Sequence, residues 1–403
     1  MTNAAEKQEP SSSELAKPSY SLWQLTLYFL KLGSLGFGGP IALVGYMHRD
    51  LVEDRRWISE ASYQEGLTLA QVAPGPLAAQ LGFYMGYVHY GIIGSTLVGI
   101  AFVLPSFLMV VALGWAYTNY GGLSWMQAVF YGVGACVIGI IALSAYKLTK
   151  KTIGTDWLLW AIYVVNAVST IVTQSERIEL ILAGGILTWL IAAPPKNWFK
   201  GNKLNSFIGL PLIPIVASVP SASSGLLWQI FTFFGMAGSF VFGSGLAIVP
   251  FLYGGVVKHY QWLDAQQFLD AVAVAMITPG PVVITTGFIG FLVAGFPGAC
   301  MAALGTFIPC YLLTIIPAPY FKKHGKKPAI AAFVNGVTVA ATGAIAGAVV
   351  VLGRQSLRDI PTVLIAVVTL ALLWKFGKKL PEPIIVVVSG IVGLVIYPLT
   401  HPV

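Results

Sequence analysis

The tripeptide Pro-Gly-Pro interrupts two apolar segments of membrane length, at residues 74–76 and, 205 residues later, at residues 279–281. Proline removes a backbone N–H donor and clashes with the preceding helical turn, so neither segment can continue as one straight helix. The two regions match over residues 37–102 and 242–307, where 14 of 66 ungapped pairs are identical. A duplicated membrane domain with interrupted helices at equivalent places is the sequence pattern of a transporter.

The composition places the chain in a membrane. Hydrophobic residues make up 57% of the 403 residues and charged residues only 9%. Lipid cannot hydrogen-bond to the backbone, so such a chain must satisfy its polar groups within helices. The apolar runs exceed the roughly 20 residues needed to cross, and they lack the alternation of a β-barrel. We therefore predict an all-α polytopic membrane protein whose net charge of +8 belongs to its loops and not to a nucleic-acid site.

Thirteen apolar segments can be distinguished along the chain. They run at approximately 22–47, 62–88, 92–118, 124–146, 157–174, 178–193, 206–220, 225–256, 265–295, 297–319, 328–352, 360–376 and 384–399. We expect two transporter repeats, at residues 21–193 and 225–403, joined by residues 194–224, a basic linker with one additional transmembrane segment. Residues 1–20 are rich in Ser, Glu, Lys and Pro, which predicts a disordered cytoplasmic tail.

The basic residues predict how the segments are oriented. If the tail is cytoplasmic and every segment crosses, sixteen lysines fall inside and six arginines outside, as the positive-inside rule requires. The loop 48–60 is then predicted outside and its counterpart 253–264 inside, so the two repeats are inverted. Inverted repeats suit alternating access, because exchanging the conformations of the two halves turns an inward-open state into an outward-open one.

The break at Pro74, Gly75 and Pro76 predicts an anion site. Gly75 permits a sharp turn, and Pro76 suits the first position of a new half-helix. The N–H groups that follow lack intrahelical partners and lie at the positive end of the helix dipole. In the first half these amides belong to Leu77, Ala78 and Ala79, and Gln80 adds a side-chain amide.

The second break, at Pro279, Gly280 and Pro281, repeats this pattern. Its amides belong to Val282, Val283 and Ile284, followed by Thr285 and Thr286, and Thr278 is placed to cap the new half-helix. The alternative is a pair of proline kinks that serve packing only. Two breaks at matched repeat positions favour the binding site.

A glycine cluster precedes each break, and it has two interpretations. Gly38, Gly39 and Pro40 stand in the first repeat, and Gly243, Ser244 and Gly245 in the second. One interpretation is another break that restarts a helix. The other is close helix contact through small residues. We leave both open for Gly38 and Gly39 and favour a functional role for Ser244.

Charged residues within the apolar segments are few. Lys31 lies five residues before Gly36, with which the first glycine cluster begins. An ammonium there is costly unless it faces a cavity or snorkels, and we favour a role in an anion pathway. Glu65 and Asp270 form a matched acidic pair at the same 205-residue offset. They are either proton-coupling carboxylates or cap-like groups at helix ends.

No pattern in the chain predicts a metal site, a cofactor or direct drive by ATP. Cys136, Cys300 and Cys310 lie in apolar segments without metal-ligand spacing, and no phosphate-binding GxxxxGK[ST] stretch exists. No paired carboxylates and no nucleophile with a neighbouring base occur within the spans. We therefore do not expect an enzyme.

These motifs together resemble the chromate ion transporter family in its long two-domain form. In the first half the resemblance rests on FGGP (37–40), the arginine-containing loop with Trp57, and LAQVAPGP (69–76) with Gln80. In the second half it rests on FGSG (242–245), Trp262 and ITPGP (277–281), and it spans most of residues 22–400.

By position, the resemblance implies functional roles at Lys31, Gly38, Gly39, Pro40, Gln71, Pro74, Gly75, Pro76, Gln80, Gly243, Gly245, Pro279, Gly280 and Pro281. The two halves differ, however. Ser244 stands opposite Gly39, Gly245 opposite Pro40, and Met276 opposite Gln71, which argues against a symmetric ligand shell.

The resemblance implies export of chromate, a tetrahedral dianion similar to sulfate, from a bacterial cytoplasm across the inner membrane, with resistance to chromate as the result. The expected partners are chromate and the lipid bilayer, and the sequence leaves a homodimer open. The alternatives are a general carrier of sulfate and other oxyanions, or an anion channel. A scaffold without transport activity would leave the matched breaks unexplained.

Overall fold

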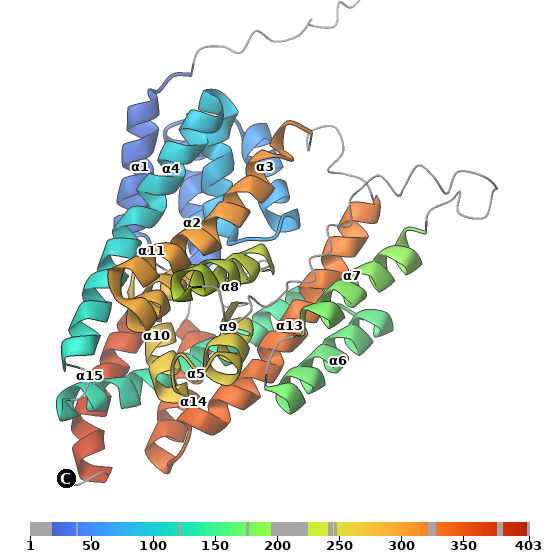
Figure 1. Cartoon of the computed structure of the whole chain (residues 1–403). Coiled ribbons are helices and arrows are strands. Elements are labelled where there is room, and N and C mark those ends of the chain that lie inside the picture. Colours follow the sequence, from blue (N-terminus) through green and yellow to red (C-terminus); the bar gives the residue numbers. More distant parts are fainter. Residues whose placement is uncertain are drawn as a thin grey trace, which may run out of the picture.

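The computed structural model describes residues 18–37, 39–120, 123–174, 177–194, 225–240, 245, 248–320, 328–376 and 382–400. Most of the predicted tail, and the predicted linker from residue 195 on, lie outside these residues. Every regular element that is described is a helix (Figure 1). This confirms the all-α prediction.

The first repeat contains α1 (Leu22–Leu35), α2 (Gly39–Met47), η1 (His48–Asp54), α3 (Glu60–Val72), α4 (Leu77–Tyr120), α5 (Ser124–Thr152), α6 (Trp157–Thr173) and α7 (Ile178–Ala192). The second contains α8 (Leu226–Phe240), α9 (Ile248–Leu252), η4 (Tyr253–His259), α10 (Ala265–Ile277), η5 (Val282–Ile284), α11 (Thr285–Ile315), α13 (Pro328–Ser356), α14 (Ile360–Phe376) and α15 (Glu382–Thr400). Five described stretches are long and apolar enough to cross a membrane: Leu77–Tyr120, Ser124–Thr152, Val282–Tyr320, Pro328–Ser356 and Glu382–Thr400.

The helix boundaries follow the 205-residue repeat. The π-helical turns η1 and η4 match each other, and α3 matches α10 at both ends. Equivalent residues begin the latter pair: the Ser59 side chain accepts a hydrogen bond from the Ser62 amide, and the Asp264 side chain accepts one from the Gln267 amide. Such N-caps satisfy amides that the first helical turn leaves unpaired.

The helices α4 and α11 each turn back on themselves. Gly91 has φ +58° and ψ −147° within α4, and Gly295 has φ +61° and ψ −153° within α11. A Cβ atom on Gly86 would lie 2.5 Å from the Gly94 carbonyl oxygen, and one on Gly290 would lie 2.4 Å from that of Gly298. The glycines therefore allow two antiparallel stretches to pack closely at each turn.

The contacts correct the prediction that every apolar segment crosses. The Tyr20 ring stacks on Trp57 with centroids 4.9 Å apart, and the Tyr20 hydroxyl lies 2.6 Å from His89 Nδ1. Residues 20, 57 and 89 thus share one end of the molecule, which we call the first face. Segments 22–47 and 62–88 enter from this face and return to it, because the chain reverses direction at the break in each segment. A kink would only have bent the helix.

The second repeat places its matched loop at the other end of the molecule. Its loop residues Trp262 and Asp264 line one cavity with Tyr117 and Tyr397, at the opposite end, which we call the second face. Thr96 near the start of the long stretch of α4 bonds to Tyr311 near the end of α11, so these equivalent stretches are antiparallel. The loops 48–60 and 253–264 thus lie at opposite ends of the molecule, but the first shares its end with residue 20, whereas we had predicted it across the membrane from the N-terminal tail.

Small residues set the packing within each repeat. A Cβ atom on Gly33 of α1 would meet the Phe102 carbonyl oxygen at 2.2 Å, and one on the equivalent Gly238 would meet the Thr306 carbonyl oxygen at the same distance. Beside this core, α6 and α7 pack against α13, and α14 and α15 pack against α5 (Figure 1). The breaks lie in the core between the two repeats.

A cysteine-accessibility experiment tests the topology. With Cys300 replaced by Ser, the exposed substitutions Ser19→Cys and Glu53→Cys should react with an impermeant maleimide from the same side of membrane vesicles. His259→Cys and Ser124→Cys, which are also at exposed positions, should react only from the other side. Labelling of Glu53→Cys from the side opposite to Ser19→Cys would show that segment 22–47 crosses.

A second prediction concerns the close approach of α1 and α4. Gly33→Ala should lower the stability of the protein in detergent by about 1–3 kcal/mol, because the added methyl group overpacks a backbone contact. Gly45→Ala is the control, since a Cβ atom there meets nothing within 4 Å. Equal thermal unfolding of the two variants would contradict the packing described.

Candidate functional site

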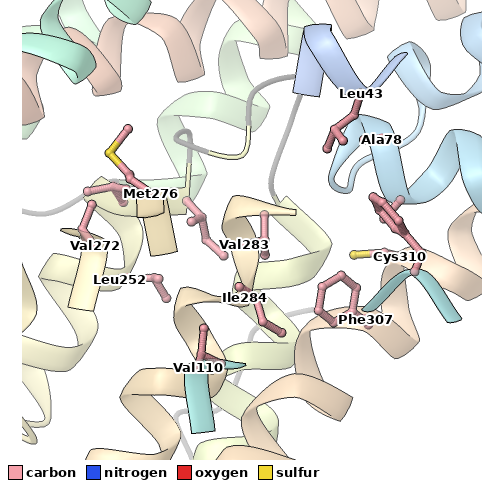
Figure 2. Close-up of a cluster of buried hydrophobic side chains, with 14 of the residues drawn as sticks. Leu43, Ala78, Val110, Leu252, Val272, Met276, Val283, Ile284, Phe307 and Cys310 are labelled. Atoms are coloured by element: carbon pink, nitrogen blue, oxygen red, sulfur yellow. The ribbon is translucent and has the colours of Figure 1, made fainter. Parts of the chain in front are cut away.

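The second Pro-Gly-Pro break meets the break at the end of α1 in the interior. The Gly280 amide of the second Pro-Gly-Pro donates a hydrogen bond to the Gly36 carbonyl, 3.0 Å away, at the end of α1. Figure 2 shows buried apolar side chains of both repeats around this region, with Leu43, Ala78 and Val110 from the first and Val283, Ile284 and Phe307 from the second. The second tripeptide is therefore brought against the end of α1 of the first repeat.

The central glycine of each tripeptide is required by its conformation and its surroundings. Gly75 has φ +142° and Gly280 has φ +96°. A Cβ atom on Gly75 would lie 3.2 Å from the Cys310 Cβ, and one on Gly280 would lie 2.7 Å from the Ser106 Oγ. In both cases the neighbour belongs to the other repeat, so each break lies against the long helix of its counterpart.

The half-helix of the first repeat begins after Pro76. Its first hydrogen bond to the preceding turn runs from the Gln80 amide to the Pro76 carbonyl, over 3.0 Å. The amides of Leu77, Ala78 and Ala79 precede that bond. Ala78 and Ala79 are buried, so these donors lie away from bulk water at the positive end of a helix.

The second half-helix differs in one respect from the prediction. The Ile284 amide donates to the Pro281 carbonyl over 2.9 Å, in the tight 3₁₀ turn η5. Only the amides of Val282 and Val283 then remain ahead of the first bond. The prediction that included Ile284 is wrong, because the chain tightens into a 3₁₀ turn where we had expected an α-helical one.

A small cavity of about 20 Å³ lies between the break at the end of α1 and the second Pro-Gly-Pro break. It is lined by Gly36, Phe37, Met276, Thr278, Gly280, Val282, Glu382 and Pro383. A cavity of this size holds about one water molecule. A tetrahedral oxyanion does not fit in the arrangement described. The two repeats must therefore separate for an anion to reach the amides.

The polar side chains at the breaks are mostly engaged. Gln80 is fully buried, and its Nε2 donates to the Pro74 carbonyl over 2.7 Å, whereas its Oε1 has no partner among the described residues. Thr278 does not cap the following half-helix as predicted, because its Oγ1 donates to the Val274 carbonyl at the end of α10. Thr285 Oγ1 donates to the Val282 carbonyl over 2.7 Å and so holds the first turn in place.

Other predicted site residues are placed in different ways. Gly245 is buried, with its Cβ position 3.3 Å from the Val282 side chain, so it joins the second break. Gly39 and Pro40 begin α2, next to the first break. Lys31 and Gln71 are exposed and do not line the cavity between the breaks. Gly38, Gly243 and Ser244 lie outside the described residues.

The matched acids Glu65 and Asp270 are not helix caps. Both lie in the interior of α3 and α10, whose caps are Ser59 and Asp264, so the cap-like alternative is wrong. Glu65 is half-buried and interacts with the Tyr84 hydroxyl. Asp270 is 4% exposed and accepts hydrogen bonds from Tyr117 and Gln266.

The structure adds residues that the sequence reasoning missed. Glu382 lines the small cavity, although it lies just outside the predicted apolar segment 384–399. Ser106 contacts the second break and Tyr117 bonds to Asp270, both from α4 of the first repeat. No spacing within one repeat could have found these pairs, because the partners are joined only by the packing of the two repeats.

Comparison with known proteins identifies relatives over nearly the full chain. The family described as "Chromate transporter" matches residues 23–189 and 228–394. The "Probable chromate transport protein" of Synechococcus elongatus is 77% identical over 380 residues, 94% of this chain and 97% of that protein. The "Chromate transport protein" of Cupriavidus metallidurans is 66% identical over 384 residues, 95% of each chain. That of Pseudomonas aeruginosa is 28% identical over 405 residues, 97% of this chain and 96% of the relative. No solved structure matches the chain.

The contact between the breaks leads to a testable prediction. Gly280→Ala should lower transport by about tenfold, since strain of about 1–3 kcal/mol at this φ, with a clash against Ser106, pushes the repeats apart. Gly295→Ala is the matched control, because its φ is also positive but its Cβ position is open. Substrate flux in proteoliposomes, with the amount of folded protein measured in parallel, separates the two. Equal flux in both variants would contradict a role for this contact.

Proposed function

The chain belongs to the chromate transporter family, and we propose that it exports chromate from the cytoplasm as a secondary transporter and so confers chromate resistance. It is a multi-pass membrane transporter and not an enzyme. The names of its relatives state chromate transport, which supports chromate as the substrate here. The direction of transport and the role in resistance are our inference.

One observation carries the proposal: the Gly280 amide of the second break bonds to the Gly36 carbonyl at the end of α1, so the two repeats, which we infer to be inverted, meet there. A site placed between inverted repeats can be opened to either face by moving one repeat against the other. The closed cavity of about 20 Å³ is consistent with an occluded arrangement without substrate.

The unpaired amides of the half-helices are the proposed anion cradle. Residues 77–79 and 282–283 present donors at the first turns that follow the two Pro-Gly-Pro breaks. Backbone donors and helix dipoles stabilise an oxyanion without a full counter-charge. Glu382 lies beside the cavity, so its carboxylate limits how tightly a dianion is held and favours release.

The energetics favour export. Moving a dianion out of a cell with a negative interior gains about 4.6 kcal/mol at roughly 100 mV, twice the value for one charge. This free energy supports export against a gradient of roughly a thousandfold. Accumulation inside the cell would instead require coupled cations.

The orientation follows from the corrected topology. Arg49, Arg55 and Arg56 lie in the loop at the first face, where α5 also ends with Lys150 and Lys151. By the positive-inside rule the first face is cytoplasmic, which supports a cytoplasmic N-terminus in the bacterial inner membrane. With the loop 48–60 inside and the loop 253–264 outside, the excess of basic residues on the cytoplasmic side is larger than in the predicted topology.

The prolines that restart the half-helices provide a direct test of the cradle. Pro76→Ala and Pro281→Ala should each abolish transport while the protein stays in the membrane, because each change allows the helix to continue through the break. Pro105→Ala, within the long stretch of α4, is the control and should retain flux. Full activity in both break variants would refute the cradle.

The proposed function itself is tested by radiolabelled chromate flux in proteoliposomes at a set membrane potential, with and without excess sulfate. Flux that follows the potential and resists sulfate supports a dedicated chromate exporter. Equal inhibition by sulfate would make the protein a general oxyanion carrier. Flux without stimulation by substrate on the far side would indicate a channel.

A further inference from the structure

A large polar cavity of about 790 Å³ lies at the second face, apart from the breaks. We call it the second-face cavity. Its walls come from α4 and α5 of the first repeat and from α10, α13 and α15 of the second. The lining includes three tyrosines and four glutamines, so the cavity is suited to water: Tyr117, Tyr131, Tyr397, Gln127, Gln266, Gln267 and Gln355.

Asp270 borders this cavity but is itself only 4% exposed. The Tyr117 hydroxyl donates a hydrogen bond to its Oδ2 over 2.8 Å, and Gln266 Nε2 donates to its Oδ1 over 2.9 Å. Tyr117 lies on α4 and Asp270 on α10, so the first of these bonds joins the two repeats. Both carboxylate oxygens are thus satisfied by neutral donors.

No cation pairs with Asp270 among the described residues. The charged groups that line the same cavity are Asp264, Arg358 and Asp359. Arg358 Nε donates to the Gln355 carbonyl over 2.7 Å, and Asp359 accepts hydrogen bonds from Tyr131 and from the Thr362 amide. A buried carboxylate without a counter-charge is costly inside a membrane domain, and proton uptake removes that cost.

We propose that Asp270 is a proton-binding site through which proton entry is coupled to chromate export. This inference rests on the proposed function and names its coupling ion. A proton fits better than a metal cation, because the Tyr117 O–H and the Gln266 N–H direct hydrogens at the carboxylate and offer no coordinating oxygen in that arrangement. Intramembrane carboxylates of this kind commonly mark proton relays.

The position of Asp270 connects protonation to movement of the repeats. It lies about two helical turns before the break that follows α10, and it accepts the Tyr117 bond that ties this helix to the other repeat. Protonation changes the hydrogen bonds that the Asp270 carboxyl group can accept. The contact between the two repeats through Tyr117 therefore differs between the two protonation states. The proton passes from cavity water to Asp270, and it leaves to water at the first face after the repeats have rearranged.

The test is the steady-state chromate ratio across proteoliposomes with the membrane potential clamped at zero. Both sides are kept alkaline, so that chromate stays a dianion, and protein-free vesicles correct for leakage. A difference of about one pH unit should shift the ratio by about tenfold for each proton exchanged, with chromate gathering on the more acidic side. Chromate–chromate exchange without a pH difference reports the folded, functional fraction.

Asp270→Asn should abolish this shift while exchange continues, because the amide cannot bind a proton. Asp264→Asn is the matched control: it removes a charge from the same cavity, keeps the cap of α10 and should retain the full shift. Tyr117→Phe keeps the carboxylate but removes the bond between the repeats. It should reduce the shift with exchange intact, and it serves as the test if Asp270→Asn does not fold.

The outcomes separate this inference from the proposed function. A full shift in Asp270→Asn, or in Tyr117→Phe if it is the only folded variant, overturns the proton site. A wild-type protein that moves chromate with no shift, or with a shift driven by sodium instead, also overturns it but leaves chromate export standing. A wild-type protein that moves no chromate refutes the proposed function itself.

Discussion

The need to satisfy backbone polar groups inside a membrane governs this structure. Two prolines at each break remove donors and end a helix, which leaves amides and carbonyls that lipid cannot bind. The protein places these groups where the two repeats meet, and the Gly280 amide is satisfied there by the Gly36 carbonyl. In the proposed cradle, the remaining amides of the half-helices bind a ligand that carries its own acceptor oxygens. Inverted repeats, close glycine contacts and the closed cavity all follow from this arrangement.

The sequence predicted the elements better than their paths. The matched breaks could be read directly, because Pro and Gly act locally through excluded conformations. The paths of segments 22–47 and 62–88 could not, since hydropathy and length do not tell a reversed hairpin from a kinked crossing. The stacking of Tyr20 on Trp57 decides between them, and it depends on packing between distant residues. Glu382 escaped notice for the same reason.

The two repeats have similar helix boundaries but different polar side chains at equivalent positions. The first half-helix carries the buried Gln80, whereas its counterpart carries Thr285 and a tighter first turn. The acid of α3 interacts with a tyrosine of its own repeat, whereas that of α10 bonds to a tyrosine of the other. Alternating access requires similar backbones so that the repeats can exchange conformations. Substrate binding and coupling can then be divided between unequal side chains.

The most direct measurement is the position of chromate itself. An anomalous-difference map recorded at the chromium absorption edge, from crystals of the protein grown with chromate, locates the ion without reference to any assumed site. The account predicts a peak between the amides of Leu77–Ala79 and those of Val282 and Val283, with the two repeats moved apart. A peak confined to the second-face cavity, with the breaks still closed on each other, would contradict it.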